Sequence, residues 1–342
     1  MHPADKAVLR LAAGMGIAVL IAYGMALRLP FAVCVMALLI LCKPGPPIPF
    51  LKGVVSALVI AGLLAAGVLM VPILEHYAFT GIVLTAVLLY GVLLKGALSA
   101  NPLTPILVIA VTLIPVAGMA EQALAPVIAA TLAVGIFTGV VVSGASHALF
   151  PDVTTPATGA ATREPVSRSS ANWTAARATL VVMPVFVLAL TNPAFYLAAI
   201  MKTVMLGQQA CSTSARTAGQ ELVGSTLMGA AMAAVLWLGL SLRPNLWMLM
   251  LWIVAAAFWG GVRLFGIRST SLPPSFWLNA LVTMLILLGP AMEDSASGKD
   301  VFSASITRVG LFVLVAFYGW ATVWALENLR AWRSKASSPR PT

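Results

Sequence analysis

Charged residues are scarce in this chain of 342 residues. Only 9% of the residues are Asp, Glu, Lys or Arg, whereas 61% are hydrophobic. Soluble globular domains contain roughly 25% charged and 45–50% apolar residues. So little polar surface excludes a water-soluble globule of this size. With a mean hydropathy of +1.00, the composition instead favours a chain whose solvent is mostly lipid.

Cysteine and histidine are also rare, with three residues of each. Three cysteines cannot form a disulfide framework, and no second Cys or His stands at the spacing of a zinc site. The sequence contains no phosphate-binding loop and no nucleophile elbow. It therefore predicts no cofactor, no metal site and no enzymatic activity.

Acidic residues are the scarcer kind of charge, since 10 Asp and Glu stand against 20 Lys and Arg and give a net charge of +10. The basic residues stand singly between apolar runs and form no basic soluble face, which excludes nucleic acid as the partner. With the N-terminus inside, fifteen of the twenty basic residues fall on the inner side of the membrane. Since cytoplasmic loops carry the excess of Lys and Arg, both termini are expected in the cytoplasm.

Apolar runs between charged, proline and glycine breaks predict an all-α integral membrane protein with about twelve transmembrane helices. The expected spans of the first half are 9–27, 30–42, 53–72, 79–94, 103–117 and 125–147, and those of the second half are 175–190, 193–207, 219–240, 245–260, 274–290 and 306–326. The chain between the halves is rich in Ser, Thr, Pro and Ala, which is typical of a flexible linker. The predicted organisation is a first six-helix membrane repeat (1–150), a cytoplasmic linker (151–172), a second six-helix membrane repeat (173–330) and a basic cytoplasmic tail (331–342).

The two halves resemble one another in sequence. Arg10 and Arg177 each begin the first span of a half, and Pro30 and Pro193 each open the second span. NPLTP before the fifth span corresponds to SLPPS before the eleventh. Because six spans return the chain to the same side, the repeats must be parallel and related by a pseudo-two-fold axis along the membrane normal. A central cleft or pore between two like halves follows.

The second span of each half is unusually short. Spans 30–42 and 193–207 fall below the roughly 20 residues that a hydrocarbon core needs. They run into irregular polar chain, CKPGPPIPFLKG in one half and GQQACSTSARTAG in the other. Interrupted helices at corresponding positions of two repeats are typical of a transporter's binding site. Tilted short helices capped by loops are the alternative, and whether these spans cross fully stays open.

Basic and amide side chains gather around these short spans. An ammonium or guanidinium beside neutral amides is suited to a carboxylate ligand. The candidate substrate-binding residues are therefore Lys43, Lys52, Lys202, Gln208, Gln209 and Arg216. Positive-inside anchoring is the competing explanation for Lys43, Lys52 and Arg216. Lys202 lies within a span, where a charge needs a cavity, a partner or a snorkelling geometry.

Glu221 is an acidic residue inside the apolar part of the ninth span. A buried carboxylate can carry a proton during transport, which makes Glu221 the candidate for proton coupling. A structural role is the alternative, because the helix dipole favours an acidic residue in the first turn and Arg216 is close enough in sequence to pair with it.

These features together resemble the fusaric acid resistance and aromatic acid exporter superfamily. The resemblance rests on KAVLRLAAGMGIA near the start, the proline-opened second span that ends in CKPG, the segment RTAGQELVGSTLMG, and the six-plus-six duplication. Longer relatives carry a sizeable cytoplasmic helical domain after each half, and here only a linker and a short tail remain. Lys52 stands where Arg216 stands in the second half, so the two positions are not identical.

The resemblance implies a secondary efflux transporter of the bacterial inner membrane for aromatic carboxylic acids or similar organic anions, driven by proton motive force or membrane potential. It implies a periplasmic adaptor protein and an outer-membrane channel as partners, in addition to membrane lipid and the small organic anion. A homo-oligomer is compatible with this organisation. A passive anion channel and a non-transporting membrane scaffold are the alternatives.

Overall fold

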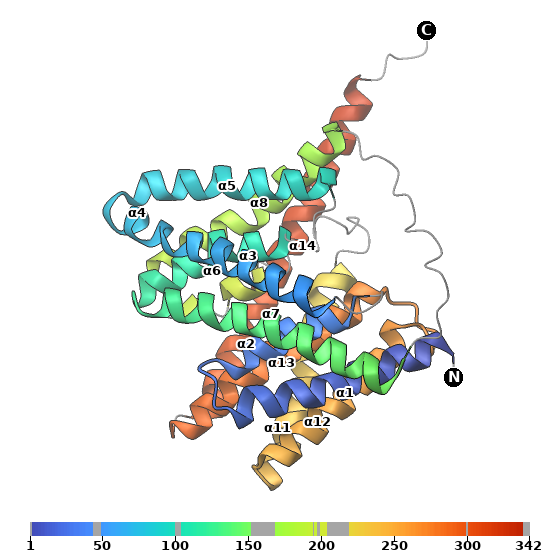
Figure 1. Ribbon diagram of the computed structural model, residues 1–342. Helices are drawn as coiled ribbons and strands as arrows, with labels where there is room; N and C mark the ends of the chain where they lie inside the picture. The colour runs from blue at the N-terminus through green and yellow to red at the C-terminus, as the bar shows by residue number, and fades with distance from the viewer. Residues whose placement is uncertain are drawn as a thin grey trace.

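The computed structural model describes residues 2–43, 49–99, 104–151, 168–193, 195–196, 199–203, 219–298 and 300–337, and helices account for all of its regular structure there. They pack side by side in one bundle (Figure 1). The first half comprises α1 (Pro3–Gly24), α2 (Pro30–Leu41), α3 (Phe50–Val68), α4 (Met70–His76), α5 (Ala78–Ser99), α6 (Thr104–Ala120) and α7 (Leu124–Leu149). The second half comprises α8 (Arg168–Thr191), a helical segment at 199–203, the π-helix η1 (Gly219–Gly224), α11 (Ser225–Leu242), α12 (Leu246–Leu264), α13 (Pro274–Ala296) and α14 (Val301–Ser337).

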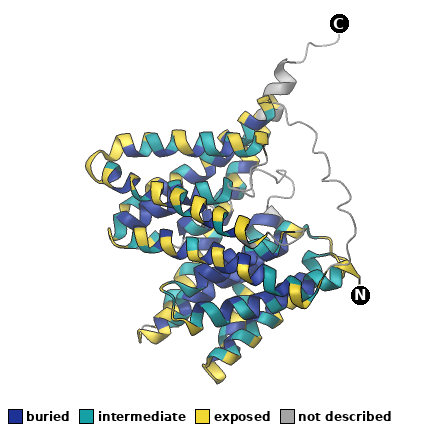
Figure 2. Cartoon of the chain, viewed as in Figure 1, coloured by how far each residue is buried: buried dark blue, intermediate teal, exposed yellow. Residues whose placement is uncertain are grey.

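The described helices have the length and surface of membrane spans. Within the described ranges, nine helical stretches are long and apolar enough to cross a membrane, and α2 and α6 are shorter apolar helices. Large apolar side chains face outward, for example Phe79, which is 81% exposed. Figure 2 shows such exposed positions along the outer faces of the bundle. So much exposed apolar surface is unfavourable in water and suited to lipid. An all-α chain of the multi-pass membrane type is confirmed, and the count of twelve spans stays a prediction.

Short sequence signals fix several helix ends. Pro30 and Pro274 stand at the first positions of α2 and α13, where the missing N–H costs nothing. The Asn245 side chain accepts a hydrogen bond from the backbone N–H of Met248 at 2.7 Å and caps α12. Gly266 and Gly298 follow α12 and α13 with φ of +74° and +68°, a conformation that glycine adopts without strain.

Several helices extend beyond the apolar runs that predicted them, and two of them reach into the expected linker and tail. α8 begins at Arg168, before the expected start at 175, and so includes part of the expected linker. α14 continues to Ser337, past the expected end at 326 and into the expected tail. The added turns contain good helix formers such as Ala, Arg, Glu, Leu and Lys and no Pro or Gly. An apolar run in the sequence predicts only the part of a helix that is suited to lipid. The helix can continue into more polar residues at either end.

The helices α2 and α13 form the centre of the bundle and contact each other. Every residue of 31–38 is buried in α2, as is every residue of 279–289 in α13. Because α2 is enclosed by protein, its length need not match the hydrocarbon thickness. Its twelve residues are therefore compatible with a place inside the bundle.

Contacts between the halves are reciprocal. α1 packs against α12, and α5 packs against α8. Within the halves, α3 crosses α6 and α11 crosses α13. Each of these two crossings has a glycine against a backbone carbonyl, Gly67 on Ala110 and Gly229 on Ala280. Such small residues let the backbones approach closely.

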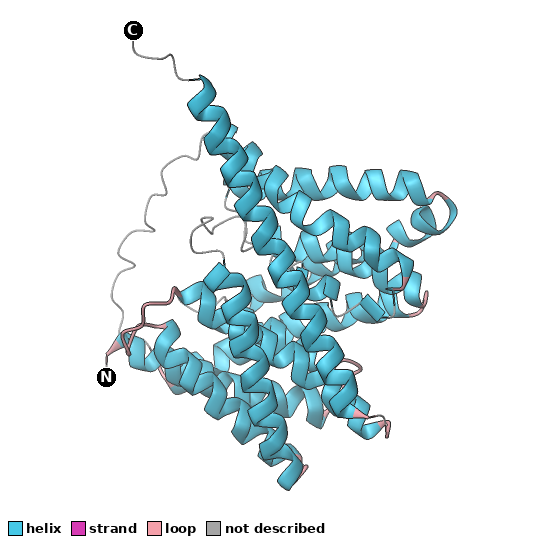
Figure 3. Cartoon of the chain, turned by 180° about the vertical axis from the view of Figure 1, so that it is seen from behind, coloured by secondary structure: helices cyan, strands magenta, loops and turns pink. Residues whose placement is uncertain are grey.

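Two long-range hydrogen bonds identify the two ends of the bundle. Lys6 Nζ donates to the carbonyl of Pro151 at 2.7 Å, which joins the start of α1 to the end of α7. Gln122 Nε2 donates to Glu75 Oε2 at 3.0 Å, which joins the end of α4 to the start of α7. The chain thus returns to its starting end after α7. Seen from behind, α14 is the long helix that crosses the bundle diagonally (Figure 3).

Candidate functional site

Lys202 is buried in the helical segment 199–203, with 1% of its surface exposed. Its Nζ donates to Thr283 Oγ1 at 2.7 Å and to Asn279 Oδ1 at 3.3 Å, both on the central helix α13. Both acceptors are neutral, and no described carboxylate forms an ion pair with Lys202. A buried ammonium is costly unless an opposite charge compensates it. The described residues alone leave this site without a counter-charge.

Asn279 and Ser225 extend the hydrogen bonds of Lys202 to α11. Asn279 Nδ2 donates to Ser225 Oγ, and Ser225 Oγ donates to the backbone carbonyl of Glu221. Thr283 Oγ1, which accepts from Lys202, donates to the carbonyl of Asn279 at 2.7 Å. Each side chain therefore has a defined donor and acceptor role, which fixes the orientation of the Asn279 amide.

Glu221 lies in the π-helix η1 and is 8% exposed. Its Oε2 accepts a hydrogen bond from Ser275 Oγ at 2.9 Å. π-Helical turns are rare and frequently occur at functional sites. Through Ser225 and Asn279, the Glu221 backbone and the Lys202 ammonium belong to one network.

The contacts between α11 and α13 form a regular ladder at four-residue spacing. Its three rungs are Glu221 with Ser275, Ser225 with Asn279, and Gly229 with Thr283. Residues four apart share one face of a helix, so two facing stripes meet in register. We refer to these six residues as the polar ladder. Lys202 joins it at the second and third rungs.

The structure brings together two of the predicted site residues, Lys202 and Glu221. Gln208, Gln209 and Arg216 lie outside the described residues. Lys43 and Lys52 are described and exposed. Among the described hydrogen bonds and ion pairs, none joins either of these lysines to the polar ladder.

Sequence reasoning omitted Ser225, Ser275, Asn279 and Thr283 from the predicted site. A signal for them exists, because polar residues recur every four positions within otherwise apolar spans. That pattern predicts a polar stripe on one helix face. The span 219–240 has polar residues at the same four-residue spacing as the span 274–290. That shared spacing would have indicated that the two polar stripes face each other.

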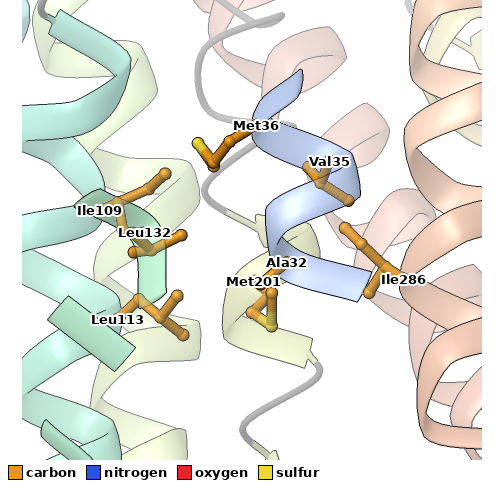
Figure 4. Close-up of a pocket in the computed structure, with 8 residues that line it drawn as sticks. All are labelled: Ala32, Val35, Met36, Ile109, Leu113, Leu132, Met201 and Ile286. Carbon is orange, nitrogen blue, oxygen red and sulfur yellow. The ribbon is translucent and has the colours of Figure 1, made fainter. Parts of the chain in front are cut away.

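An apolar plug lies beside Lys202 where the two halves meet. Ala32, Val35 and Met36 of α2 and Met201 belong to it, together with Ile109, Leu113, Leu132 and Ile286. Figure 4 shows these carbon and sulfur side chains around a small cavity. Its volume of about 20 Å³ has room for a single water and not for an aromatic acid. Among the described residues, this cavity between the halves is therefore too small for an organic anion.

Aromatic side chains surround an arginine near the start of α13. The Arg263 guanidinium carbon lies 3.8 Å from the ring centre of Trp259 and 5.2 Å from that of Trp277. The two indole rings meet edge to face at 5.4 Å. Phe276 packs edge to face on Trp277 and follows the ladder residue Ser275 in sequence. An arginine held on indole faces keeps planar donors for a carboxylate.

Comparisons with protein-family models, curated proteins and solved structures find no match to this chain. The resemblance to the aromatic acid exporter superfamily rests on its sequence motifs alone.

Proposed function

We propose that the chain is a secondary transporter of organic anions, aromatic carboxylates in particular, with Lys202 as the anion-binding group. The observation that carries the proposal is the burial of this ammonium among neutral oxygens. A bound carboxylate supplies the missing counter-charge, and the attraction is strong because water is excluded. Among the described residues, two acceptors receive hydrogen bonds from Lys202 Nζ, and in this proposal the third N–H donates to the ligand.

The aromatic cluster supports an aromatic substrate. Arg263 with Trp259 and Trp277 offers a cation for the carboxylate and indole faces and edges for the ring. It lies at the end of α13 that carries Ser275 and Phe276. An anion arriving from that end meets Arg263 before it reaches Lys202.

The proposed architecture is twelve spans in two parallel six-helix repeats related by a pseudo-two-fold axis along the membrane normal. Reciprocal packing supports it, because the first helix of each half contacts the fourth span of the other half, α1 with α12 and α8 with α5. The third and fifth spans of each half also cross in the same way, with Gly67 on Ala110 and Gly229 on Ala280. In both halves a glycine of the third span packs on the backbone carbonyl of an alanine in the fifth span, and such a close contact depends on a small residue at that position. Two unrelated helix pairs would not be expected to share it.

The repeats differ at the site. If Ala110 corresponds to Ala280, then Ile109 and Leu113 stand where the second half has Asn279 and Thr283. Both apolar residues belong to the central plug. The proposal therefore includes one anion site per chain, built from the second repeat, with the first repeat supplying the apolar wall.

The small cavity between the halves favours a transporter over an open channel. A 20 Å³ apolar cavity passes neither water chains nor anions, and moving a substrate past it requires the halves to rearrange. A passive anion channel that opens at this plug is the second candidate, and a non-transporting scaffold the third.

The proposed setting is the bacterial inner membrane, with both termini in the cytoplasm. An inside-negative potential then drives anions outward at about 2.3 kcal/mol per charge per 100 mV. Export across a two-membrane envelope calls for the periplasmic adaptor and outer-membrane channel as partners. Glu221 is the proposed proton carrier if transport is coupled to protons.

Release of labelled benzoate from vesicles containing the purified chain tests the proposal. We expect Lys202→Met to slow the release at least about tenfold at benzoate concentrations below saturation, where the rate follows occupancy and a tenfold change corresponds to roughly 1.4 kcal/mol of binding. The matched control is Lys95→Met, which changes an exposed lysine of α5 and leaves the release unchanged. Wild-type protein should not release an aromatic quaternary ammonium.

Release by Lys202→Met at the wild-type rate, in a variant that elutes and melts like wild type, would remove Lys202 from the site. Selective release of the cation would overturn the anion proposal. Release that follows voltage alone, without any effect of a pH gradient, would identify the passive channel instead.

A further inference from the structure

A large apolar groove lies on the outer surface of the second half. It has a volume of about 650 Å³, runs between α11 and α14, and has α13 as its floor. The floor is made of buried side chains, among them Leu288 and Ala291. The α11 wall carries small residues such as Ala230 and Ala234, and the α14 wall includes Ile306.

The groove opens to the apolar surroundings of the bundle. Its wall residues Leu238, Ile306 and Phe302 are 66%, 55% and 76% exposed. Ser305 is the one lining residue with a polar side chain beyond the indole N–H of Trp237. A polar ligand would lose hydrogen bonds on entering this groove, because the groove offers almost no partners for it. A hydrocarbon chain has no hydrogen bonds to lose.

The groove has the length of one membrane leaflet. On α11 it extends from Ala230 to Leu238, about 12 Å at 1.5 Å per residue. It stops one turn before Arg243, the first charged residue after α11. One leaflet contributes roughly half of a 30 Å hydrocarbon core. The groove therefore covers the depth of a single acyl chain.

Polar groups lie beside the groove on α14 and at the end of α13. Asp294 and Arg308 form an ion pair there. Asp294 lies about one turn from Ala291, and Arg308 about one turn from Ser305, both of which line the groove. A charged pair beside an apolar groove can contact the polar headgroup of a lipid whose acyl chain lies in the groove.

The fold does not require this opening. In the first half, α3 and α7 pack directly on each other, and Gly53 lies against Val140. In the second half, α14 contacts η1 and also α11, and the groove lies along part of the line where α11 and α14 face each other. Gly310 lines the groove, and an added Cβ there would meet no atom within 4 Å. Among the described residues, α3 and α7 of the first repeat are thus in contact where the second repeat has this groove between α11 and α14.

We propose that this groove binds one acyl chain of a membrane phospholipid, from the leaflet that contacts the turn between α13 and α14. The groove has exposed apolar walls and extends along α11 for about the depth of one leaflet, and its polar neighbours are Ser305 and the Asp294–Arg308 ion pair. An unfilled space of this size would forfeit the dispersion contacts of its walls. The inference does not depend on the transported substrate or on Lys202.

Photolabelling tests it with the full chain in phosphatidylcholine vesicles whose acyl chains carry a diazirine. We expect adducts to be concentrated severalfold in peptides covering 230–238 and 301–310, relative to the exposed faces of α3 and α5. The double variant Ala234→Leu with Gly310→Leu fills the groove and should reduce these adducts severalfold. The control Gly62→Leu adds the same side chain at an exposed α3 glycine that also has no neighbour within 4 Å, and should change nothing.

Labelling spread evenly over all exposed helices would overturn the proposal, as would unchanged groove adducts in a folded double variant. If the double variant fails to fold, the wild-type map decides alone. Cross-links between two copies of the chain from the same peptides would assign the groove to a second copy. Protection of these peptides by benzoate would assign it to the substrate. Either assignment replaces the lipid.

Discussion

Arg177 on α8 forms an ion pair with Glu327 on α14, with Nη1 2.5 Å from Oε1. Arg177 is 6% exposed and Glu327 29% exposed. Trp173 Nε1 also donates to this carboxylate oxygen, at 3.4 Å. The contact joins two helices that are far apart in sequence and holds the long helix α14 against the rest of the bundle.

The first prediction is that Glu327→Gln destabilises the chain. Removing the carboxylate breaks the ion pair of the buried Arg177 with Glu327, and breaking a fully buried pair costs about 3–5 kcal/mol. Since Glu327 is partly exposed, we expect the lower end of that range. Thermal unfolding in detergent measures the loss, and the exposed Glu121→Gln is the control. The double variant Arg177→Met with Glu327→Met should recover much of the stability, and a double variant as unstable as the single one would contradict this account.

The second prediction concerns the two glycine crossings. An added Cβ at Gly229 would lie 2.6 Å from both the carbonyl oxygen of Ala280 and the Cβ of Thr283, and one at Gly67 would strike the Ala110 carbonyl. Gly229→Ala and Gly67→Ala should therefore both lower the melting temperature. Gly62→Ala on the same helix as Gly67 meets no atom and should be neutral or stabilising by up to about 1 kcal/mol.

Only Gly229→Ala should also weaken benzoate binding, because it displaces Thr283 from Lys202. Equal binding by the two destabilised variants would show that the α11 crossing does not support the site.

The sequence could predict most helices but few of their partners. Apolar runs mark where a helix suits lipid, and a lysine within such a run, Lys202, already stands out because its charge needs an explanation. Its acceptors Asn279 and Thr283 could not be assigned, because they lie on another span and the choice depends on how the helices pack. The pairing of Arg177 with Glu327 is of the same kind.

The sequence also could not predict the π-helical turn at Glu221, because η1 continues directly into α11 and the residues of both are compatible with an ordinary α-helix. The periodicity and hydropathy of a sequence predict which face of a helix is apolar or polar. Which other helix packs against that face is determined by the tertiary structure.

The third prediction is that Asn279→Asp weakens benzoate binding while it preserves the fold. Asp has nearly the shape of Asn and places a carboxylate beside Lys202, where it supplies the counter-charge that the substrate would otherwise provide. We expect at least about a tenfold weaker affinity, measured as loss of the thermal stabilisation by benzoate. Asn245→Asp is the control, because Asp also caps a helix. Undiminished benzoate binding would contradict the role of the Lys202 charge.

The fourth prediction separates proton coupling from substrate binding at Glu221. Gln keeps an oxygen that can accept the hydrogen bond from Ser275 and cannot release a proton, so Glu221→Gln should fold and bind benzoate normally. Transport driven by a pH gradient should fall at least about tenfold, whereas exchange of labelled for unlabelled benzoate, which needs no net proton movement, should continue. The exposed Glu75→Gln should affect neither. Loss of exchange together with driven transport would make Glu221 part of the binding site, and unchanged driven transport would leave it a structural role.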